Sequence, residues 1–234
     1  MKSKVGVGCA AMAAAGLAAA SAHAAPQTYR YSVSHPLYGL IGAYERTGDD
    51  TDGETRAQAH LTIVVRILGV VVRRETADQN EAWRGGRLLS FQSLTSTDGR
   101  RSTIAGEASG SGFRVTSPSG TQTAPPDVVA SDPWSLTHVG PGTVVSIRTG
   151  KISSVEVTGG EPETLLLKGV SQATRHYHVN ARGQPNKWEV WIDRRGVPIK
   201  FRSQESSGAI DFTLVSRPPS DGGAVPAFAT DRTR

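Results

Sequence analysis

Two histidines two positions apart are the clearest pair of metal ligands in the sequence. They belong to His176-Tyr177-His178, inside a predicted β-strand at 174–179. Residues two apart on a strand share a face, so both imidazoles can reach one zinc ion. His60, on another predicted strand, is the predicted third ligand. The simpler interpretation is two surface or half-buried strand histidines, because the sequence places no carboxylate beside them.

Other polar groups have the residue types for chemistry but lack the required pattern. An acidic loop has oxygen ligands for calcium without the glycine and distal glutamate of a helical calcium loop: Asp49, Asp50, Asp52 and Glu54. A catalytic triad could be assembled from scattered residues that nothing aligns: Ser135, His138 and Asp132. Nucleophile-elbow, zinc-protease, phosphate-loop and dinucleotide-binding motifs are absent from the sequence. No catalytic residue and no cofactor are predicted, and whether the domain is an enzyme stays open.

Aromatic side chains are the candidate lining of a ligand pocket. The predicted ligand-binding residues are Trp134, Trp188, Trp191 and Tyr31. Aromatic residues in a β domain more often fill the core, and that interpretation is kept as the alternative. A pocket is favoured by strands that are apolar on both sides, such as the run at 61–68, because a second apolar face must be covered by a sheet, a helix or a ligand.

The pattern of short apolar runs and glycine turns predicts an all-β domain. We expect a single antiparallel curved sheet or flattened barrel of roughly twelve strands with one short helix. The strongest hairpin signal is Asp98-Gly99 between two such runs. The helix is predicted at 131–136, where Asp132 can cap and Pro133 can occupy the first helical position. Trp134 is expected to anchor this helix in the open side of the sheet.

The segment 187–202 is the clearest local hairpin. Its Asp193-Arg194-Arg195-Gly196 sequence predicts a type I turn with the glycine in the left-handed region beside a bulge. That turn would pair Trp191 with Ile199, whereas a two-residue loop would pair Val190 with Ile199. Both registers stay open at this point. In either one, Trp188 and Trp191 lie on opposite faces, because their separation is odd.

The two ends of the chain differ in composition from its middle. Residues 1–24 have a basic start, an apolar run at 5–20 and the small-x-small site Ala22-His23-Ala24, which predict a cleaved secretory signal peptide. The run is shorter than the ~20 residues of a spanning helix. The β domain is predicted at 25–216, and the tail 217–234 is predicted to be disordered because it is rich in proline and glycine.

Cysteine and charge limit the compartment and the partners. The single cysteine, Cys9, lies in the predicted signal peptide, so the mature chain would be cysteine-free, as suits the periplasm or a secreted protein. The formal net charge is +5, and the basic residues form no stripe that would bind nucleic acid. No later segment is long enough to span a membrane. A lipid or other apolar ligand is the candidate partner, and oligomeric state is not predicted.

Four segments taken together resemble one protein family. They are 35–42 (HPLYGLIG), 74–78 (RETAD), 131–135 (SDPWS) and 190–201 (VWIDRRGVPIKF). The chain resembles an uncharacterised family of exported bacterial proteins, domain of unknown function 6134, from about Tyr29 to Val215. The C-terminal hairpin is more distantly similar to domain of unknown function 3108. The resemblance implies an exported β domain and assigns no activity or site residue.

Three functions remain compatible with these patterns. The leading prediction is an exported binding or carrier module for an apolar or amphipathic ligand. The alternative is a structural or interaction protein of the cell envelope, and the third is a metal-dependent hydrolase at His176 and His178. A cavity above ~300 Å³ favours the first. A filled core favours the second, and three converging nitrogens or oxygens favour the third.

Overall fold

The described part of the protein is one large β-sheet with a short helix. The computed structural model describes residues 25–136, 142–182, 187–205 and 208–219. The predicted signal peptide, His138 of the scattered triad and all but the first three residues of the predicted tail lie outside these ranges. Within them, fifteen strands belong to a single sheet, which confirms the all-β prediction.

The strands follow one another as hairpins along most of the chain. The first eight are β1 (Gln27–His35), β2 (Gly39–Thr51), β3 (Glu54–Ile67), β4 (Val70–Arg84), β5 (Arg87–Thr97), β6 (Arg100–Ser109), β7 (Gly112–Ser117) and β8 (Gly120–Ala124). Then come β9 (Val129–Ala130), α1 (Pro133–Leu136), β10 (Gly142–Val145), β11 (Ile152–Leu167), β12 (Val170–Ala181), β13 (Lys187–Asp193), β14 (Pro198–Glu205) and β15 (Gly208–Ser216).

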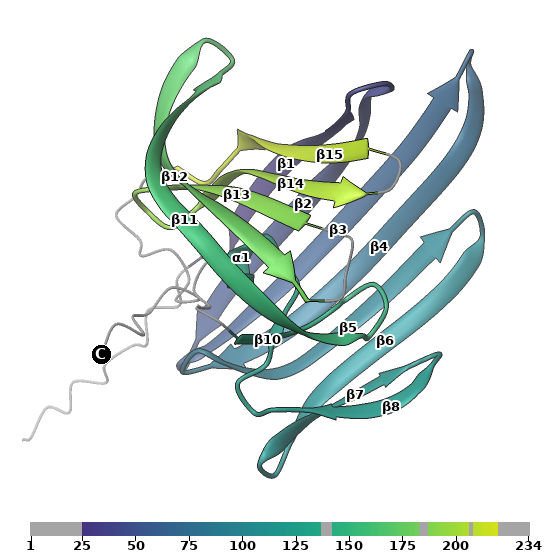
Figure 1. Cartoon of the computed structure of the whole chain (residues 1–234), viewed down its shortest axis with the longest axis vertical. Helices are drawn as coiled ribbons and strands as arrows, with labels where there is room; N and C mark the ends of the chain where they lie inside the picture. The colour runs from purple at the N-terminus through teal and green to yellow at the C-terminus, as the bar shows by residue number, and fades with distance from the viewer. Residues whose placement is uncertain (1–24, 137–141, 183–186, 206–207, 220–234) are drawn as a thin grey trace, which may run out of the picture.

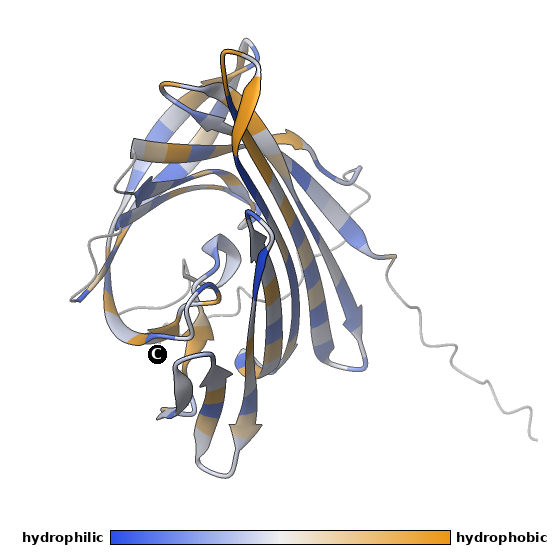
Figure 2. Ribbon diagram, turned by 90° about the vertical axis from the view of Figure 1, so that its right-hand side faces the viewer, coloured by the Kyte–Doolittle hydropathy of each residue, from blue (hydrophilic) through white to orange (hydrophobic). Residues whose placement is uncertain are grey.

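The sheet is curved and open. Its order is β8-β7-β6-β5-β4-β3-β2-β1-β15-β14-β13-β12-β11-β10-β9, so the pairing of β1 with β15 joins two halves. Neighbours are antiparallel except for β9 and β10, which are parallel. Figures 1 and 2 show the halves curling toward each other with α1 between them. The predicted curved sheet is therefore confirmed, with a parallel exception at one edge.

Two hydrophobic clusters hold the facing halves together. The first joins strands β4–β8 to the segment from β9 to β12, with Leu88, Phe113 and Val179 fully buried. The second joins β1–β3 to β13–β15 and includes Trp134 of α1. On the longer strands each cluster takes alternate residues, as expected where one face of a sheet is buried, whereas the short strands β9 and β10 contribute consecutive residues.

The prediction of roughly twelve strands was too low, since the sheet has fifteen, and the predicted bounds of β4 were wrong because polar residues face the interior. The runs at 70–76 and 81–83 predict two separate strands, but β4 continues from Val70 to Arg84. Gln79 and Glu81 lie on its inner face and are buried, and the Gln79 amide donates to the Glu81 carboxylate. Inward polar residues interrupt the apolar alternation by which strands are predicted.

The β13–β14 hairpin has the predicted turn and a register that differs from both alternatives. The Gly196 N–H donates to the Asp193 carbonyl oxygen at 3.0 Å. Trp191 lies opposite Lys200 and Val190 lies opposite Phe201, so both predicted registers were wrong. A bulge separates these pairs from the turn. It falls beside Pro198, which has no N–H to donate across the ladder.

Gly196 adopts the predicted positive φ, at 78°. Replacing it with alanine is expected to destabilise the protein by about 1 kcal/mol or more, because a Cβ is disfavoured in the left-handed region. Urea unfolding measures the change. Arg194→Ala in the same exposed turn is the control, with an expected change below about 0.5 kcal/mol. A neutral Gly196→Ala would contradict the assigned turn.

Candidate functional site

A cavity lies inside the curve of the sheet. Its volume is about 360 Å³, and it is lined by β2–β5 on one side, β12–β15 on the other, and the segments 131–133 and 146–151. Phe201 of the second cluster and Val144 of the first both line it. The cavity therefore occupies the place where the two hydrophobic clusters meet and neither fills the interior.

One wall of this cavity is apolar. Tyr44, Leu61 and Ile63 line it from β2 and β3. Phe201 and Phe212 line it from β14 and β15, and the Tyr44 ring meets each of them edge-on, at centroid distances of 5.7 and 5.9 Å. This wall offers aromatic and aliphatic surface to the non-polar part of a ligand.

The next strands make the wall polar. Gln79, Ser93 and Thr95 line the cavity from β4 and β5. Glu75, the register partner of Ile63, is only 2% exposed, yet its two carboxylate oxygens lie 2.9 and 2.8 Å from the guanidinium groups of Arg148 and Arg73. The lining therefore changes from apolar on β3 to charged on the neighbouring strand β4.

A buried ionic network fixes α1 next to the cavity. The Arg46 guanidinium, from β2, donates to Asp132 at 2.7 Å and lies 3.7 Å from Glu81 of β4. The other Asp132 oxygen accepts the Trp134 backbone N–H at 2.6 Å. Arg46 also lies over the Trp134 ring, 5.3 Å from its centroid. The network therefore ties the start of α1 to both β2 and β4.

Glu81 makes this network sensitive to pH. Burial of its carboxyl group, and then the negative charge of Asp132, raise its pKa to about 7, against the opposing effect of Arg46. Folded protein therefore holds a proton that the unfolded chain releases above its ordinary pKa of about 4.3. The contribution of this proton to the free energy of unfolding is complete below that ordinary pKa. It is lost as the pH rises to about 7, and the free energy of unfolding then falls by up to about 1.4 kcal/mol per pH unit.

Glu81→Gln tests this prediction. Urea unfolding from pH 4.5 to 8 should show wild-type stability falling with pH, whereas the variant should lose that part of the slope. Glu107→Gln is the control, because Glu107 pairs with Arg114 on the exposed surface. A wild-type slope that Glu81→Gln leaves unchanged would assign the titration to another group.

The structure separates the four aromatic residues predicted to bind a ligand. Trp188 lines the cavity. Trp134 is 3% exposed and packs on Tyr29, with ring centroids 4.6 Å apart, beside the cavity-lining Asp132 and Pro133. Tyr31 is a buried core residue whose hydroxyl donates to the Pro198 carbonyl at 2.9 Å. Trp191 lies on the outer face, opposite to Trp188 as their odd spacing predicts.

Glu75 and Arg148 of the site were not predicted from the sequence. Glu75 falls on a strand, and its alternation with Gln79 and Glu81 places it inward, which is a usable signal once β4 is read as continuous. Arg148 comes from the turn between β10 and β11, and only the approach of distant strands brings it to Glu75.

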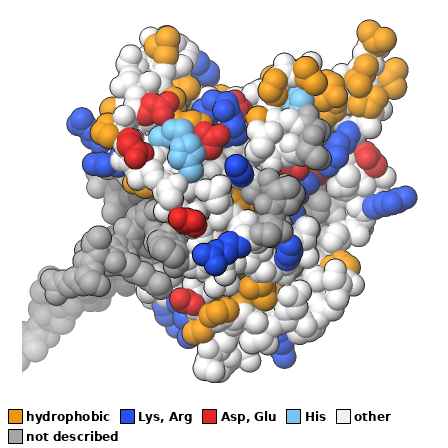
Figure 3. Space-filling view, viewed as in Figure 1, with side chains coloured by type: hydrophobic (Ala, Val, Ile, Leu, Met, Phe, Trp, Pro, Cys, Tyr) orange, Lys and Arg blue, Asp and Glu red, His pale blue; other side chains and the backbone are white. Residues whose placement is uncertain are grey.

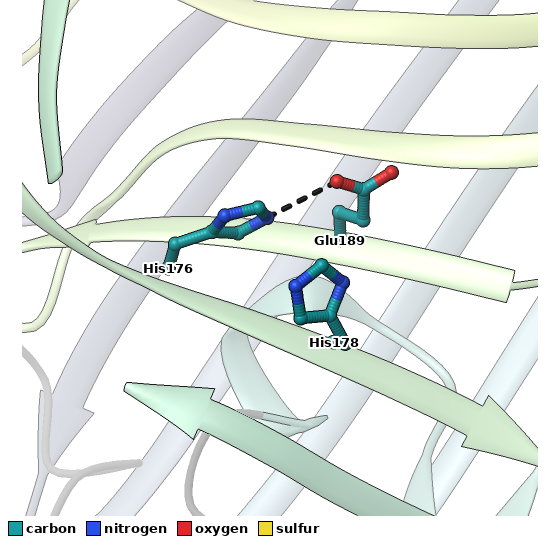
Figure 4. A group of neighbouring side chains, drawn as sticks. All are labelled: His176, His178 and Glu189. Atoms are coloured by element: carbon teal, nitrogen blue, oxygen red, sulfur yellow. Dashed lines mark hydrogen bonds and ion pairs between the residues drawn. The ribbon is translucent and has the colours of Figure 1, made fainter. Parts of the chain in front are cut away.

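The predicted metal ligands are partly brought together. His176 and His178 lie on the same outer face of β12, and Glu189 of β13 joins them (Figure 4). His60 lies apart from them on β3, where its ring nitrogens contact Asp78 at 2.7 Å and Thr62 at 3.1 Å. The carboxylate of Glu189, which was not predicted from the sequence, therefore takes the place of the expected third imidazole.

Comparison with known proteins identifies a family and a shared fold. A family model described as "Domain of unknown function (DUF6134)" matches residues 40–215. No curated protein matches the chain. One similar solved structure is a β-barrel-like protein of domain of unknown function DUF1849 from Brucella abortus, with a TM-score of 0.64 and 10% identity over 84% of this chain and 98% of that one. At 10% sequence identity, this similarity shows a shared fold.

In the ranges that the structure describes, no helix has the length and apolar character to cross a membrane.

Proposed function

The chain belongs to the family called domain of unknown function 6134, and we propose that it is a binding or carrier module for an amphipathic ligand. The observation that carries the proposal is the cavity of about 360 Å³ inside the curved sheet. This volume lies within the range of about 300–1,000 Å³ for small-molecule sites. It also exceeds the volume of ~300 Å³ above which a carrier is favoured over a structural protein with a filled core.

The lining supports an amphipathic ligand over a purely apolar one. The aromatic wall around Tyr44, Phe201 and Phe212 suits a hydrocarbon or ring system. Arg148, which pairs with both Glu75 and Glu205, would meet a polar head group at the charged part of the lining. Buried polar groups without partners are costly, so the ligand's polar atoms should match these charged residues and not the aromatic wall.

Filling the cavity tests the proposal. Ala77→Phe adds a ring to an inward position of β4 that lines the cavity. The apolar dye N-phenyl-1-naphthylamine should bind wild-type protein and bind this variant at least tenfold more weakly. Ala43→Phe, at an exposed position of β2, is the matched control and should bind as wild type. Equal dye binding by wild type and Ala77→Phe, or no binding by wild type, would overturn the proposal.

Native mass spectrometry identifies the natural ligand. Protein purified from bacterial cells should retain one small molecule, and Ala77→Phe should lose it while Ala43→Phe keeps it. A wild-type mass equal to that of the bare chain, with dye excluded as well, would favour the envelope structural protein.

Export is part of the same proposal. It is supported by Lys2 and Lys4, the apolar run and the cleavage site Ala22-His23-Ala24. Protein from the envelope fraction should begin at Ala25 or within about two residues of it, as N-terminal sequencing or intact mass would show. An intact Met1 in that fraction would contradict export through a cleaved signal.

A further inference from the structure

Three metal-ligand side chains converge on the outer face of the sheet, and we propose that they bind a divalent transition metal ion such as zinc. One ligand atom from each of His176, His178 and Glu189 lies within 4.8 Å of the other two (Figure 4). Glu189 of β13 is the direct register partner of His178 on β12. Because the residues belong to paired strands, the sheet fixes the spacing of their backbones.

The surroundings of His176 select which nitrogen would bind the metal. Its Nδ1 lies 2.9 Å from a carboxylate oxygen of Glu163, and its Nε2 lies 3.1 Å from one of Glu189. Metal-binding histidines commonly donate their second ring N–H to a carboxylate, which fixes the tautomer. With Nδ1–H donating to Glu163, the Nε2 lone pair faces the Glu189 oxygen. Two acceptors this close are stabilised by a cation shared between them.

The packing beneath the histidines holds the site in place. The Trp191 ring stacks on His176 at a centroid distance of 4.1 Å and is only 5% exposed, although it lies on the outer face. The His178 ring is 4.4 Å from that of His176. Beside His176, β11 contains a bulge between Gly159 and Glu161, and a Cβ on Gly159 would lie 2.6 Å from the His176 carbonyl oxygen. The bulge bends β11 beside the site, as bulges near functional residues often do.

The types of ligand atom suit zinc, and a carboxylate offsets part of the positive charge nearby. Two imidazole nitrogens and a carboxylate oxygen are borderline ligands that match Zn²⁺ or Cu²⁺ better than Ca²⁺ or Mg²⁺. Arg202 lies 3.9 Å from Glu189, but its guanidinium makes two hydrogen bonds to Asp211, at 2.6 and 3.0 Å. Asp211 also pairs with Lys200 at 3.2 Å, so it offsets part of the positive charge next to the site. Three protein ligands leave a fourth position for water or for a ligand from a partner.

Zinc titration of chelator-stripped protein, prepared without a polyhistidine tag, tests the site. Isothermal calorimetry should give one zinc per chain. His178→Ala should weaken binding at least tenfold, and Glu163→Gln should weaken it about 10- to 100-fold through loss of the carboxylate that orients His176. Zinc should also change the fluorescence of Trp191 in wild type.

His60→Ala is the matched control. His60 is also an exposed strand histidine beside a carboxylate, Asp78, and it lies outside the group of three. Its loss should leave zinc affinity unchanged. The proposal is overturned if wild-type protein binds no zinc, or if His60→Ala and His178→Ala weaken binding equally. Circular dichroism of each variant separates lost binding from lost folding.

A second, independent observation concerns two neighbouring hairpin tips with exposed apolar side chains, and from it we infer docking onto an anionic lipid bilayer. At the β3–β4 turn Leu68 is 100% exposed, and the side chains around it are exposed as well: Ile67, Val70, Val71 and Val72. At the neighbouring β1–β2 turn Leu37 and Leu40 are 78% and 74% exposed. Figure 2 shows the β3–β4 tip as a hydrophobic projection, and Figure 3 shows apolar side chains gathered at this end.

Basic residues decide between a bilayer and a second copy of the chain. Arg66 and Arg74 flank the β3–β4 tip and are exposed, and Arg73, also exposed, pairs with the buried Glu75. Anionic head groups attract such arginines while the apolar side chains enter the boundary between head groups and acyl chains. A symmetric dimer through the same tip would instead bring like charges together.

Flotation with lipid vesicles tests the docking surface. Wild-type protein should float with vesicles of phosphatidylethanolamine and phosphatidylglycerol, and much less with phosphatidylcholine alone. Leu68→Asp combined with Val70→Asp should reduce binding at least tenfold. Leu166→Asp is the matched control, because Leu166 is 71% exposed at the β11–β12 hairpin, and it should bind normally. Equal binding by both variants, no binding by wild type, or a wild-type dimer that Leu68→Asp dissociates would overturn the inference.

Discussion

Replacing Trp134 with alanine is expected to lower the free energy of unfolding by about 3–5 kcal/mol. A helix of four residues is too short to be stable alone, so packing must hold α1 in place. Trp134 supplies that packing, because it is 3% exposed and lies against Tyr29 and under Arg46. Urea unfolding monitored by far-ultraviolet circular dichroism measures the change.

Trp134→Phe separates packing from hydrogen bonding at this position. Among the residues that the structure describes, none accepts a hydrogen bond from the buried Nε1 of Trp134, so phenylalanine loses no such bond and should cost less than alanine does. Binding of the apolar dye should survive in Trp134→Phe, because the Trp134 side chain belongs to the core beside the cavity. A small cost for alanine, together with a changed bound ligand, would instead make Trp134 a cover of the cavity mouth.

Asp132→Ala is expected to destabilise the protein by about 3–5 kcal/mol, because it leaves a buried charge without its closest partner. Asp132 accepts from the Arg46 guanidinium at 2.7 Å and from the Trp134 N–H at 2.6 Å, and all of these groups are buried. Its removal leaves Arg46 with the Glu81 carboxylate, which lies 3.7 Å away. Denaturant unfolding measures the effect, and Asp132→Asn, which keeps an oxygen acceptor, should cost less.

The double variant Arg46→Met with Asp132→Ala tests the cause of this cost. If the loss comes from an uncompensated buried charge, the double variant should be less destabilised than the sum of the two single variants. Additive effects would show that Asp132 acts mainly by capping α1. Where Asp132→Ala is too unstable to purify, the same cycle can be made with Asp132→Asn.

Local patterns were enough to predict the class of fold and several of its parts. Alternating apolar residues and glycine turns identify strands because side chains on a strand alternate between faces. The Asp193-Gly196 turn and the helix start at Asp132-Pro133 were predicted for the same kind of reason, since each depends on the few residues that form it. The family resemblance likewise followed from short segments, and the match over residues 40–215 confirms it.

Register was beyond local prediction. Both alternatives for the β13–β14 hairpin were wrong because a bulge near Pro198 shifts the pairing by a residue. A one-residue shift changes which side chains are neighbours across the strands. The inward orientation of Gln79 and Glu81 was also missed. Because both residues are polar, the sequence pattern did not indicate that this part of β4 has an inner face.

The functional geometry depended on contacts between residues far apart in the sequence. His176 and His178 share a face by spacing alone, and this the sequence determined by itself. Glu189 reaches them only through the pairing of β12 with β13, and Arg148 reaches Glu75 only when the two halves of the sheet face each other. The cavity likewise exists because the curved halves approach without filling the space between them. Spacing along a strand is fixed by backbone geometry, whereas these approaches are fixed by the curvature and packing of the whole sheet.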